Sequence, residues 1–143
     1  MDSTFAPRAY HSTAVLLPDG RVLSAGQTRG NLQTTGEVFS PTYLFAGPRP
    51  VIDAAPQAIG YGESFVVETA GAAAIDEVTL IRASTVTHGV YFDQRSVPLS
   101  FTPGADTLTV SEPASNLDAP PGWYMLFVLD GGVPSVAAWV QVS

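Results

Sequence analysis

The sequence predicts an all-β protein, and three observations carry this prediction. Short runs that alternate apolar and polar residues recur from residue 51 to the end of the chain. The chain contains 13 glycines and 12 prolines, which are residue types that mark the turns between short strands. Helix signals are poor, because the alanine run at 72–74 is too short to nucleate a helix alone.

The first element is a predicted β-hairpin. Residues 13–17 and 21–25 form two apolar runs, and Pro18-Asp19-Gly20 lies between them. An Asp-Gly pair between two such runs is a strong short-range signal for a hairpin. The pair is similar to half of a kelch propeller blade. Only a single copy is present in this sequence, whereas a propeller is built from several repeats.

A domain border is predicted after this segment. A short strand ending at Pro41 is followed by an aromatic and aliphatic cluster at 42–45, and then by Ala46-Gly47-Pro48-Arg49-Pro50. Two prolines so close together fix φ and remove backbone donors, which forces an extended connector. We therefore divide the chain into residues 1–46, the hairpin and its connector, and residues 47–143.

The pattern of residues 47–143 predicts an immunoglobulin-like β-sandwich. Alternation is clearest at Tyr124, Leu126 and Val128, and it recurs near the C-terminus. Many short strands separated by Gly, Pro and Asp turns are typical of this architecture. The cysteine pair of antibody domains is missing, so the likeness is to the architecture alone. The strands are predicted at 64–67, 77–82, 87–92, 97–101, 107–110, 122–129 and 135–142.

Composition excludes several classes of function. The formal net charge is -7, opposite in sign to the basic footprint that binding to nucleic acid or to anionic lipid requires. The absence of cysteine excludes disulfides, thiolate metal sites and cysteine nucleophiles in this chain. No apolar run reaches the roughly 20 residues that span a membrane, and the first residues carry no signal-peptide pattern.

The chain has two histidines, His11 and His88, and each has two interpretations. A histidine beside a tyrosine at the start of a strand, or in a Thr-His-Gly turn, often serves as a hydrogen-bonded structural residue. Alternatively both are metal ligands. Two imidazoles and a phenolate would suit Cu(II), which favours nitrogen and oxygen ligands in tetragonal geometry. Spacing alone does not decide between these interpretations.

The phrases around the two histidines favour the second interpretation. Arg8-Ala9-Tyr10-His11-Ser12 and Val86-Thr87-His88-Gly89-Val90 resemble phrases of the galactose oxidase and glyoxal oxidase family, the copper-radical oxidases. Further stretches that resemble the family follow in the same order over nearly the whole chain, at 37–45, 93–99, 120–128 and 132–137. The ordered set resembles the C-terminal region of these enzymes, which is a propeller hairpin followed by an early-set domain.

The resemblance implies a copper site. It implies that Tyr10 is the axial tyrosine, which takes the substrate hydroxyl proton, and that His11 and His88 are the two imidazole ligands. It also implies that His88 lies on a long hairpin formed by residues 80–91, with 86–89 near the tip, where Gly89 tolerates positive φ. The family's radical cofactor, a tyrosine crosslinked to cysteine, lies in propeller blades that are not in this sequence. We therefore expect this chain alone to be inactive.

Two other groups of residues receive structural interpretations. Asp93-Gln94-Arg95 is expected to form an ion pair or turn cap at a strand end, in preference to acting as a catalytic acid. Trp123, Tyr124, Phe127 and Trp139 would suit a surface on which sugars stack. Because alternate residues of a strand face opposite sides, most of them are expected in the core. An exposed Trp139 would favour the sugar hypothesis.

The leading hypothesis is the C-terminal part of a copper-radical oxidase whose parent converts a primary alcohol, aldehyde or sugar with dioxygen into an oxidised product and hydrogen peroxide. The resemblance implies an extracellular location, with the missing propeller or a second copy as partner, because an unpaired hairpin exposes an apolar face. The alternative is a non-catalytic immunoglobulin-like module that binds carbohydrate or protein. A complete enzyme is disfavoured, since no Gly-x-Ser-x-Gly phrase is present.

Overall fold

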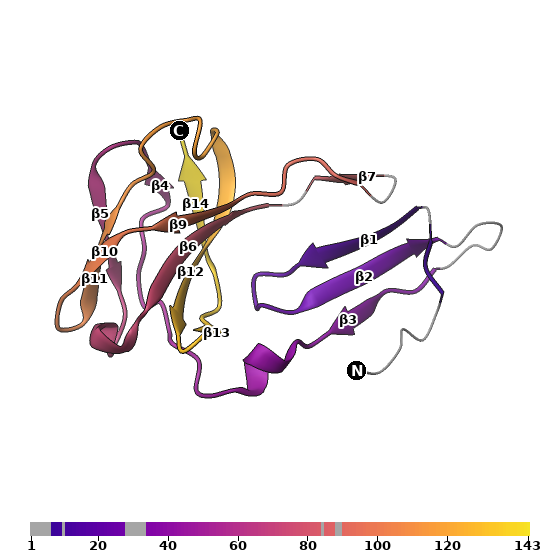
Figure 1. Ribbon diagram of the computed structural model, residues 1–143, viewed down its shortest axis with the longest axis horizontal. Helices are drawn as coiled ribbons and strands as arrows, with labels where there is room; N and C mark the ends of the chain where they lie inside the picture. Colours follow the sequence, from indigo (N-terminus) through magenta and orange to yellow (C-terminus); the bar gives the residue numbers. More distant parts are fainter. Residues whose placement is uncertain (1–6, 10, 28–33, 84, 88–89) are drawn as a thin grey trace.

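The computed structural model describes residues 7–9, 11–27, 34–83, 85–87 and 90–143. A small N-terminal sheet lies beside a β-sandwich, and helical structure among these residues is limited to two short 3-10 turns (Figure 1). The predicted all-β class and the immunoglobulin-like sandwich are therefore confirmed. Among the described residues, no helix is long and apolar enough to cross a membrane.

The N-terminal sheet contains the predicted hairpin. Strands β1 (His11–Leu16) and β2 (Val22–Gln27) pair antiparallel, and β3 (Glu37–Phe39) adds to the free edge of β2. The turn is closed by the Leu17 amide, which donates to the Arg21 carbonyl at 2.8 Å. Gly20 has φ of +82°, a conformation that favours glycine. The 3-10 turn η1 (Thr42–Phe45) follows.

The sandwich has two sheets. One has the order β10-β11-β5, and the other has the order β4-β14-β12-β6-β9 with β13 paired to β12. The first is formed by β5 (Ser64–Glu68), β10 (Phe101–Pro103) and β11 (Thr107–Ser111). The second is formed by β4 (Ala58–Ile59), β6 (Glu77–Arg82), β9 (Ser96–Leu99), β12 (Gly122–Asp130), β13 (Val133–Pro134) and β14 (Ala138–Val142). The 3-10 turn η2 (Ala72–Ala74) precedes β6.

The core lies between these two sheets, where alternation predicted it. Tyr124, Leu126 and Val128 on β12 are fully buried. They pack in one cluster with Leu80 of β6 and Val67 of β5. Because side chains alternate across a strand, the neighbouring residues of β12 point to the outer face of the sheet.

Three of the predicted strands differ from the structure. In place of one strand at 87–92, the described residues of this stretch belong to two short strands, β7 (Val86–Thr87) and β8 (Val90–Tyr91), paired antiparallel with each other. Residues 97–101 are divided between β9 and β10, which belong to different sheets. Residues 135–142 yield only β14, because β13 ends at Pro134. The border predicted between residues 46 and 47 stays a prediction.

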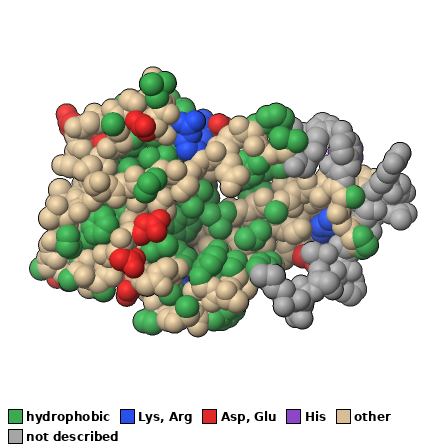
Figure 2. Space-filling model, in the orientation of Figure 1, with side chains coloured by type: hydrophobic (Ala, Val, Ile, Leu, Met, Phe, Trp, Pro, Cys, Tyr) green, Lys and Arg blue, Asp and Glu red, His purple; other side chains and the backbone are tan. Residues whose placement is uncertain are grey.

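The N-terminal sheet contacts the outer face of the larger sandwich sheet. The Ala137 amide donates to the Pro18 carbonyl at 2.8 Å, and Arg49 in the connector donates to the Pro134 and Ser135 carbonyls at 2.8 and 2.7 Å. A cavity of about 230 Å³ lies between the two parts, lined by Leu16 and Tyr43 on one side and Phe127 and Leu129 on the other. Figure 2 shows hydrophobic side chains over both parts of the visible face, with charged side chains few and dispersed.

Candidate metal centre

His11 is the first residue of β1 and pairs with Gln27 of β2. Its side chain is exposed, so the imidazole lies at the surface of the molecule and not in the core. Of the three predicted copper ligands, His11 alone lies within the described residues. Tyr10 and His88 lie outside them, so the structure does not test their roles.

The segment that leads into His11 is fixed by a buried arginine. Arg8 has a side chain only 4% exposed. It donates to the Gly26 carbonyl at 2.9 Å and forms an ion pair with Glu37 at 3.1 Å. These contacts tie the residues before β1 to both β2 and β3. The Ser12 amide also donates to the Ala9 carbonyl at 2.8 Å. The chain is therefore anchored on both sides of the predicted ligands Tyr10 and His11.

Two buried polar atoms in this region have no hydrogen-bond partner among the residues that the structure describes. They are Nε of Arg8 and Oγ1 of Thr13, which lies on β1 two residues after His11. Buried polar atoms in folded proteins are usually paired, and an unpaired one often marks a site that water, an ion or another chain completes. Both atoms belong to residues within three positions of His11 in the sequence and not to the sandwich core.

The second half of the candidate site is an arm that projects from the sandwich. Beyond the paired strands β6 and β9, the described residues between 83 and 95 extend away from the larger sheet, and β7 and β8 form the far part of this extension (Figure 1). The Phe92 amide donates to the Thr85 carbonyl at 3.2 Å, which holds the two sides of the arm together. Within residues 80–91, where a long hairpin is expected, the described residues include the end of β6 and the paired strands β7 and β8; residues 88 and 89, at the expected tip, lie outside the described residues.

The arm reaches the strand on which His11 lies. Cα atoms of β7 lie within 8 Å of Cα atoms of β1, although the two strands are distant in sequence. Thr87, the last residue of β7, directly precedes His88 in the sequence. The fold therefore brings together the strands that flank the two histidines. Among the described residues, no group of three or more His, Cys, Asp or Glu side chains could hold a metal ion.

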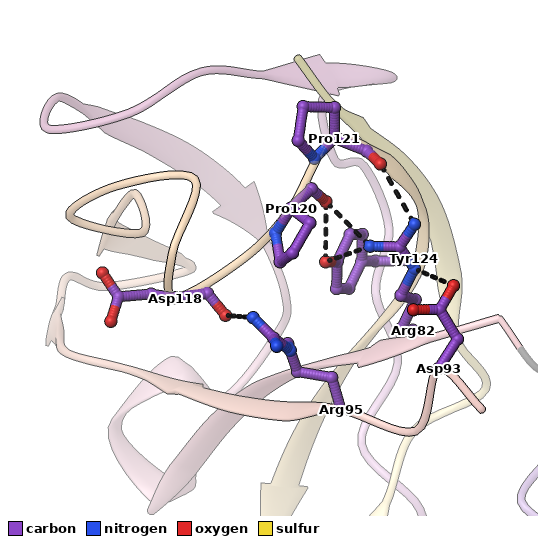
Figure 3. A network of polar contacts seen from close by, with 7 residues as sticks. All are labelled: Arg82, Asp93, Arg95, Asp118, Pro120, Pro121 and Tyr124. Carbon is purple, nitrogen blue, oxygen red and sulfur yellow. Dashed lines mark hydrogen bonds and ion pairs between the residues drawn. The ribbon is translucent and has the colours of Figure 1, made fainter. Parts of the chain in front are cut away.

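The base of the arm carries a polar network (Figure 3). Asp93, just after β8, forms an ion pair with Arg82 at 2.9 Å. Nη1 of Arg95 donates to the carbonyls of Leu117 and Asp118 at 2.7 and 3.0 Å. The ion pair or turn cap predicted for Asp93-Gln94-Arg95 is confirmed. The part played by Arg82 was not predicted from the sequence, because its other partners, the Tyr124 hydroxyl and the carbonyls of Pro120 and Pro121, are distant in sequence.

The cavity between the two parts does not resemble a catalytic site. Glu77 is the one acidic residue among its lining residues, and most of the rest are apolar. Burial raises the pKa of the Tyr43 phenol above its ordinary value, so this side chain stays neutral and serves as a hydrogen-bond donor. The cavity is best described as part of the contact between the N-terminal sheet and the sandwich.

Comparison with known proteins agrees with the fold. The sandwich is of the immunoglobulin-like class, and the family model "Galactose oxidase-like, Early set domain" matches residues 49–142. The chain therefore belongs to the galactose oxidase-like early-set domain family.

Similarity to individual proteins extends beyond the matched domain. The chain is 41% identical to the aldehyde oxidase GLOX of Vitis pseudoreticulata, covering 95% of this chain and 30% of the relative. It is 36% identical to a galactose oxidase of Gibberella zeae, covering 95% of this chain and 22% of the relative. A fungal alcohol oxidase of the AA5 family, solved in complex with copper, superposes with a TM-score of 0.88 at 34% identity, covering 99% of this chain and 32% of the other. The chain thus spans about a third or less of the length of these relatives.

Proposed function

We propose that this chain is the C-terminal, ligand-bearing part of a copper oxidase that converts a primary alcohol or aldehyde and dioxygen into the oxidised product and hydrogen peroxide. Tyr10, His11 and His88 are the proposed ligands. The observation that carries the proposal is the approach of β7 to β1, because it brings the segments next to both histidines together. Similarity to aldehyde, galactose and alcohol oxidases supports the same reaction class.

The donor set fits copper. Two imidazoles and a phenolate are nitrogen and oxygen ligands of the kind that Cu(II) accepts, and His11 is exposed at a strand end where an ion can reach it. When bound, the metal would supply a one-electron redox partner for the oxidation. In this proposal the Tyr10 phenolate oxygen would take the hydroxyl proton of the substrate, while His11 and His88 would hold the metal.

This chain alone is proposed to lack activity. It contains no cysteine, so it cannot form the crosslinked tyrosine and cysteine that its resemblance to the copper-radical oxidases implies. The missing partner is a propeller domain, or a second copy of the chain. Exposed hydrophobic residues on the N-terminal sheet, Val38 at 48% and Phe39 at 44%, are consistent with such a partner. We place the parent enzyme outside the cell.

The test is a Cu(II) titration of the chain, followed by calorimetry and electron paramagnetic resonance. The expected result is binding of one ion per chain with a tetragonal signal coupled to two nitrogens. His11→Ala and His88→Ala should each remove one nitrogen coupling, and the double variant, which has no imidazole left, should lose the signal. Weak binding that the double variant shares would overturn the proposed ligand set. Thermal unfolding of each variant shows that the fold is intact.

One observation favours a second candidate, a carbohydrate-binding module. Trp123 is 52% exposed and Trp139 is 45% exposed. In the register of β12 and β14, Trp123 faces Gln141 and Met125 faces Trp139, so the two indoles are diagonal neighbours on one face. Aromatic pairs of this kind provide an apolar surface with a polar edge. Titration with oligosaccharides, followed by tryptophan fluorescence in the chain and in Trp139→Ala, would detect binding, and an unchanged spectrum would exclude this candidate.

A further inference from the structure

The root of the arm is tied to the sandwich through one guanidinium group. Arg82 is the last residue of β6, and Nε of its side chain faces Asp93 at 2.9 Å. Nη1 donates to the Pro120 carbonyl at 3.2 Å and to the Tyr124 hydroxyl at 3.3 Å, and Nη2 donates to the Pro121 carbonyl at 3.2 Å. Arg82 therefore contacts the returning side of the arm on one edge and the start of β12 on the other (Figure 3).

The sandwich side of this network is rigid. Tyr124 is fully buried, and its hydroxyl donates to the Pro120 carbonyl at 2.8 Å. Cζ of Arg82 lies 5.6 Å from the centre of the Tyr124 ring, within range of a cation–π interaction. Gly122 leaves room for the guanidinium, since a Cβ there would lie 3.0 Å from Nη2. The planar fork of arginine suits several fixed acceptors at once, which a lysine ammonium does not.

Two backbone hydrogen bonds lie where the arm leaves the sheet. The Arg82 amide donates to the Arg95 carbonyl at 3.0 Å, and the Ala83 amide donates to the Trp123 carbonyl at 3.1 Å. Beyond these bonds, the Arg82–Asp93 ion pair joins the two sides of the arm where they leave the sheet. The Asp93 side chain is 42% exposed, so this pair adds little to global stability. Its position, where the two sides of the arm leave the sheet, suits a contact that restricts the angle between the arm and the sandwich.

A small change of that angle is amplified at the far end. A fully extended chain from residue 82 to residue 87 would cover on the order of 16 Å, so a tilt of about 10° would move its far end by about 3 Å. Metal–nitrogen distances tolerate changes of only about 0.2 Å. Without the Arg82–Asp93 ion pair, the arm would therefore bring a metal ligand to β1 in a smaller fraction of molecules.

We propose that Arg82 and Asp93 are positioning residues, which hold the β7–β8 hairpin at β1 and so present His88 to the metal. The copper part of this inference rests on the proposed function, whereas the placement of the hairpin does not. Neither side chain touches the metal or the substrate. Arg82 acts from the sandwich and Asp93 acts from the arm, so the two residues can be tested separately.

The position of the β7–β8 hairpin relative to β1 can be measured in the absence of copper. The chain has no cysteine, so Ala14→Cys on β1 and Val90→Cys on β8, both exposed, introduce two unique sites for nitroxide labels. Double electron–electron resonance should give one narrow distance distribution in this background. Asp93→Ala, which leaves the sandwich contacts of Arg82 in place, should broaden or shift it, and Arg82→Gln should do so more strongly. An unchanged distribution in both variants overturns the proposal.

The matched control is Arg95→Gln. Arg95 also donates to backbone carbonyls at 117 and 118, but its side chain does not join the ion pair at the root of the arm. This variant should keep the narrow distribution. If it broadens the distribution as much as Asp93→Ala does, the effect is general loosening and the positioning role is wrong. Thermal unfolding of all three variants identifies any that fail to fold, and Asp93→Ala is expected to unfold within a few degrees of the parent.

Copper affinity then tests whether the position of the hairpin affects metal binding. Loss of a group that orients a ligand typically weakens metal binding by about 10-fold to 100-fold, and we expect Asp93→Ala to fall in this range with an altered resonance spectrum. Unchanged affinity and spectrum, in a parent chain that does bind through its histidines, would overturn the positioning role. If the parent does not bind copper through its histidines, the proposed function fails, and the distance measurement still decides whether Arg82 and Asp93 hold the hairpin.

Discussion

The Tyr43 hydroxyl donates a hydrogen bond of 2.5 Å to the Gly20 carbonyl, and this contact joins η1 to the turn between β1 and β2. Gly20 is buried with positive φ, and a Cβ at this position would lie 3.1 Å from Cδ2 of Leu44. The turn of the hairpin and the connector are thus packed as one unit, which holds the N-terminal sheet against the sandwich.

Tyr43→Phe is expected to lower the free energy of unfolding by about 1 kcal/mol at neutral pH, the usual contribution of one hydrogen bond. The pKa of Tyr43 is raised above its ordinary value of 10.0, chiefly by burial. A raised pKa gives stability that is complete below the unfolded-state pKa and is lost as pH rises through the folded-state value. The parent should therefore lose more stability above pH 10 than the variant does, as measured by urea unfolding. Parallel losses in both would contradict this prediction.

Alternation predicted β12 well, whereas sheet membership was not predictable from the same pattern. Tyr124, Leu126 and Val128 were expected on one face and are all fully buried. Residues 97–101 carry an equally continuous pattern, yet β9 and β10 belong to different sheets. The pattern records which residues are apolar, but it does not record where the chain crosses from one sheet to the other, because that depends on partner strands distant in sequence.

Leu80→Ala should be among the most destabilising substitutions in the sandwich. Leu80 lies on β6 and is fully buried in the core cluster, and removal of a buried leucine side chain typically costs about 2–5 kcal/mol through lost burial and the cavity that remains. The control is Val66→Ala on β5, since Val66 is 52% exposed and should change stability by less than about 0.5 kcal/mol. Similar urea midpoints for both variants would contradict this description of the core.

The candidate site was predicted from short sequence motifs, and such motifs do not contain the distances between residues that are far apart in the sequence. The sequence motifs around His11 and His88 are the basis for proposing these residues as ligands, but they contain no distance, because residues remote in sequence meet only through the fold. The fold adds that β7, which precedes His88 in the sequence, lies close to β1, on which His11 lies. The carbonyls of Pro120 and Pro121 that bind Arg82 could not have been predicted, since every residue has a carbonyl and local sequence does not mark which one is used.

Arg8→Ala is expected to destabilise the N-terminal sheet by about 2 kcal/mol, because it removes the hydrogen bond to the Gly26 carbonyl and the ion pair with Glu37 that a buried guanidinium makes. The matched control is Arg21→Ala. Arg21 also pairs with a carboxylate, that of Asp19 at 2.7 Å, but its side chain is 46% exposed, so the loss should stay within about 1 kcal/mol. Hydrogen exchange at the Ser12 amide, which donates to Ala9, should accelerate only in Arg8→Ala. Equal acceleration of exchange in both variants would contradict the prediction that Arg8 anchors the residues before β1.

Gly26→Ala should disrupt β1 at the point where His11 lies. Gly26 has φ of +107°, and a Cβ there would lie 2.2 Å from the His11 carbonyl oxygen and 2.6 Å from Cα of Ser12. Because both neighbours are backbone, the strands must separate, and we expect Cu(II) affinity to fall at least about 10-fold with a loss of about 3 kcal/mol. Gly62→Ala is the control, since φ is +79° with nothing within 4 Å. It should carry backbone strain alone, about 1 kcal/mol, and bind copper as the parent does. Equal effects on copper affinity would show that the clash at His11 is not what matters.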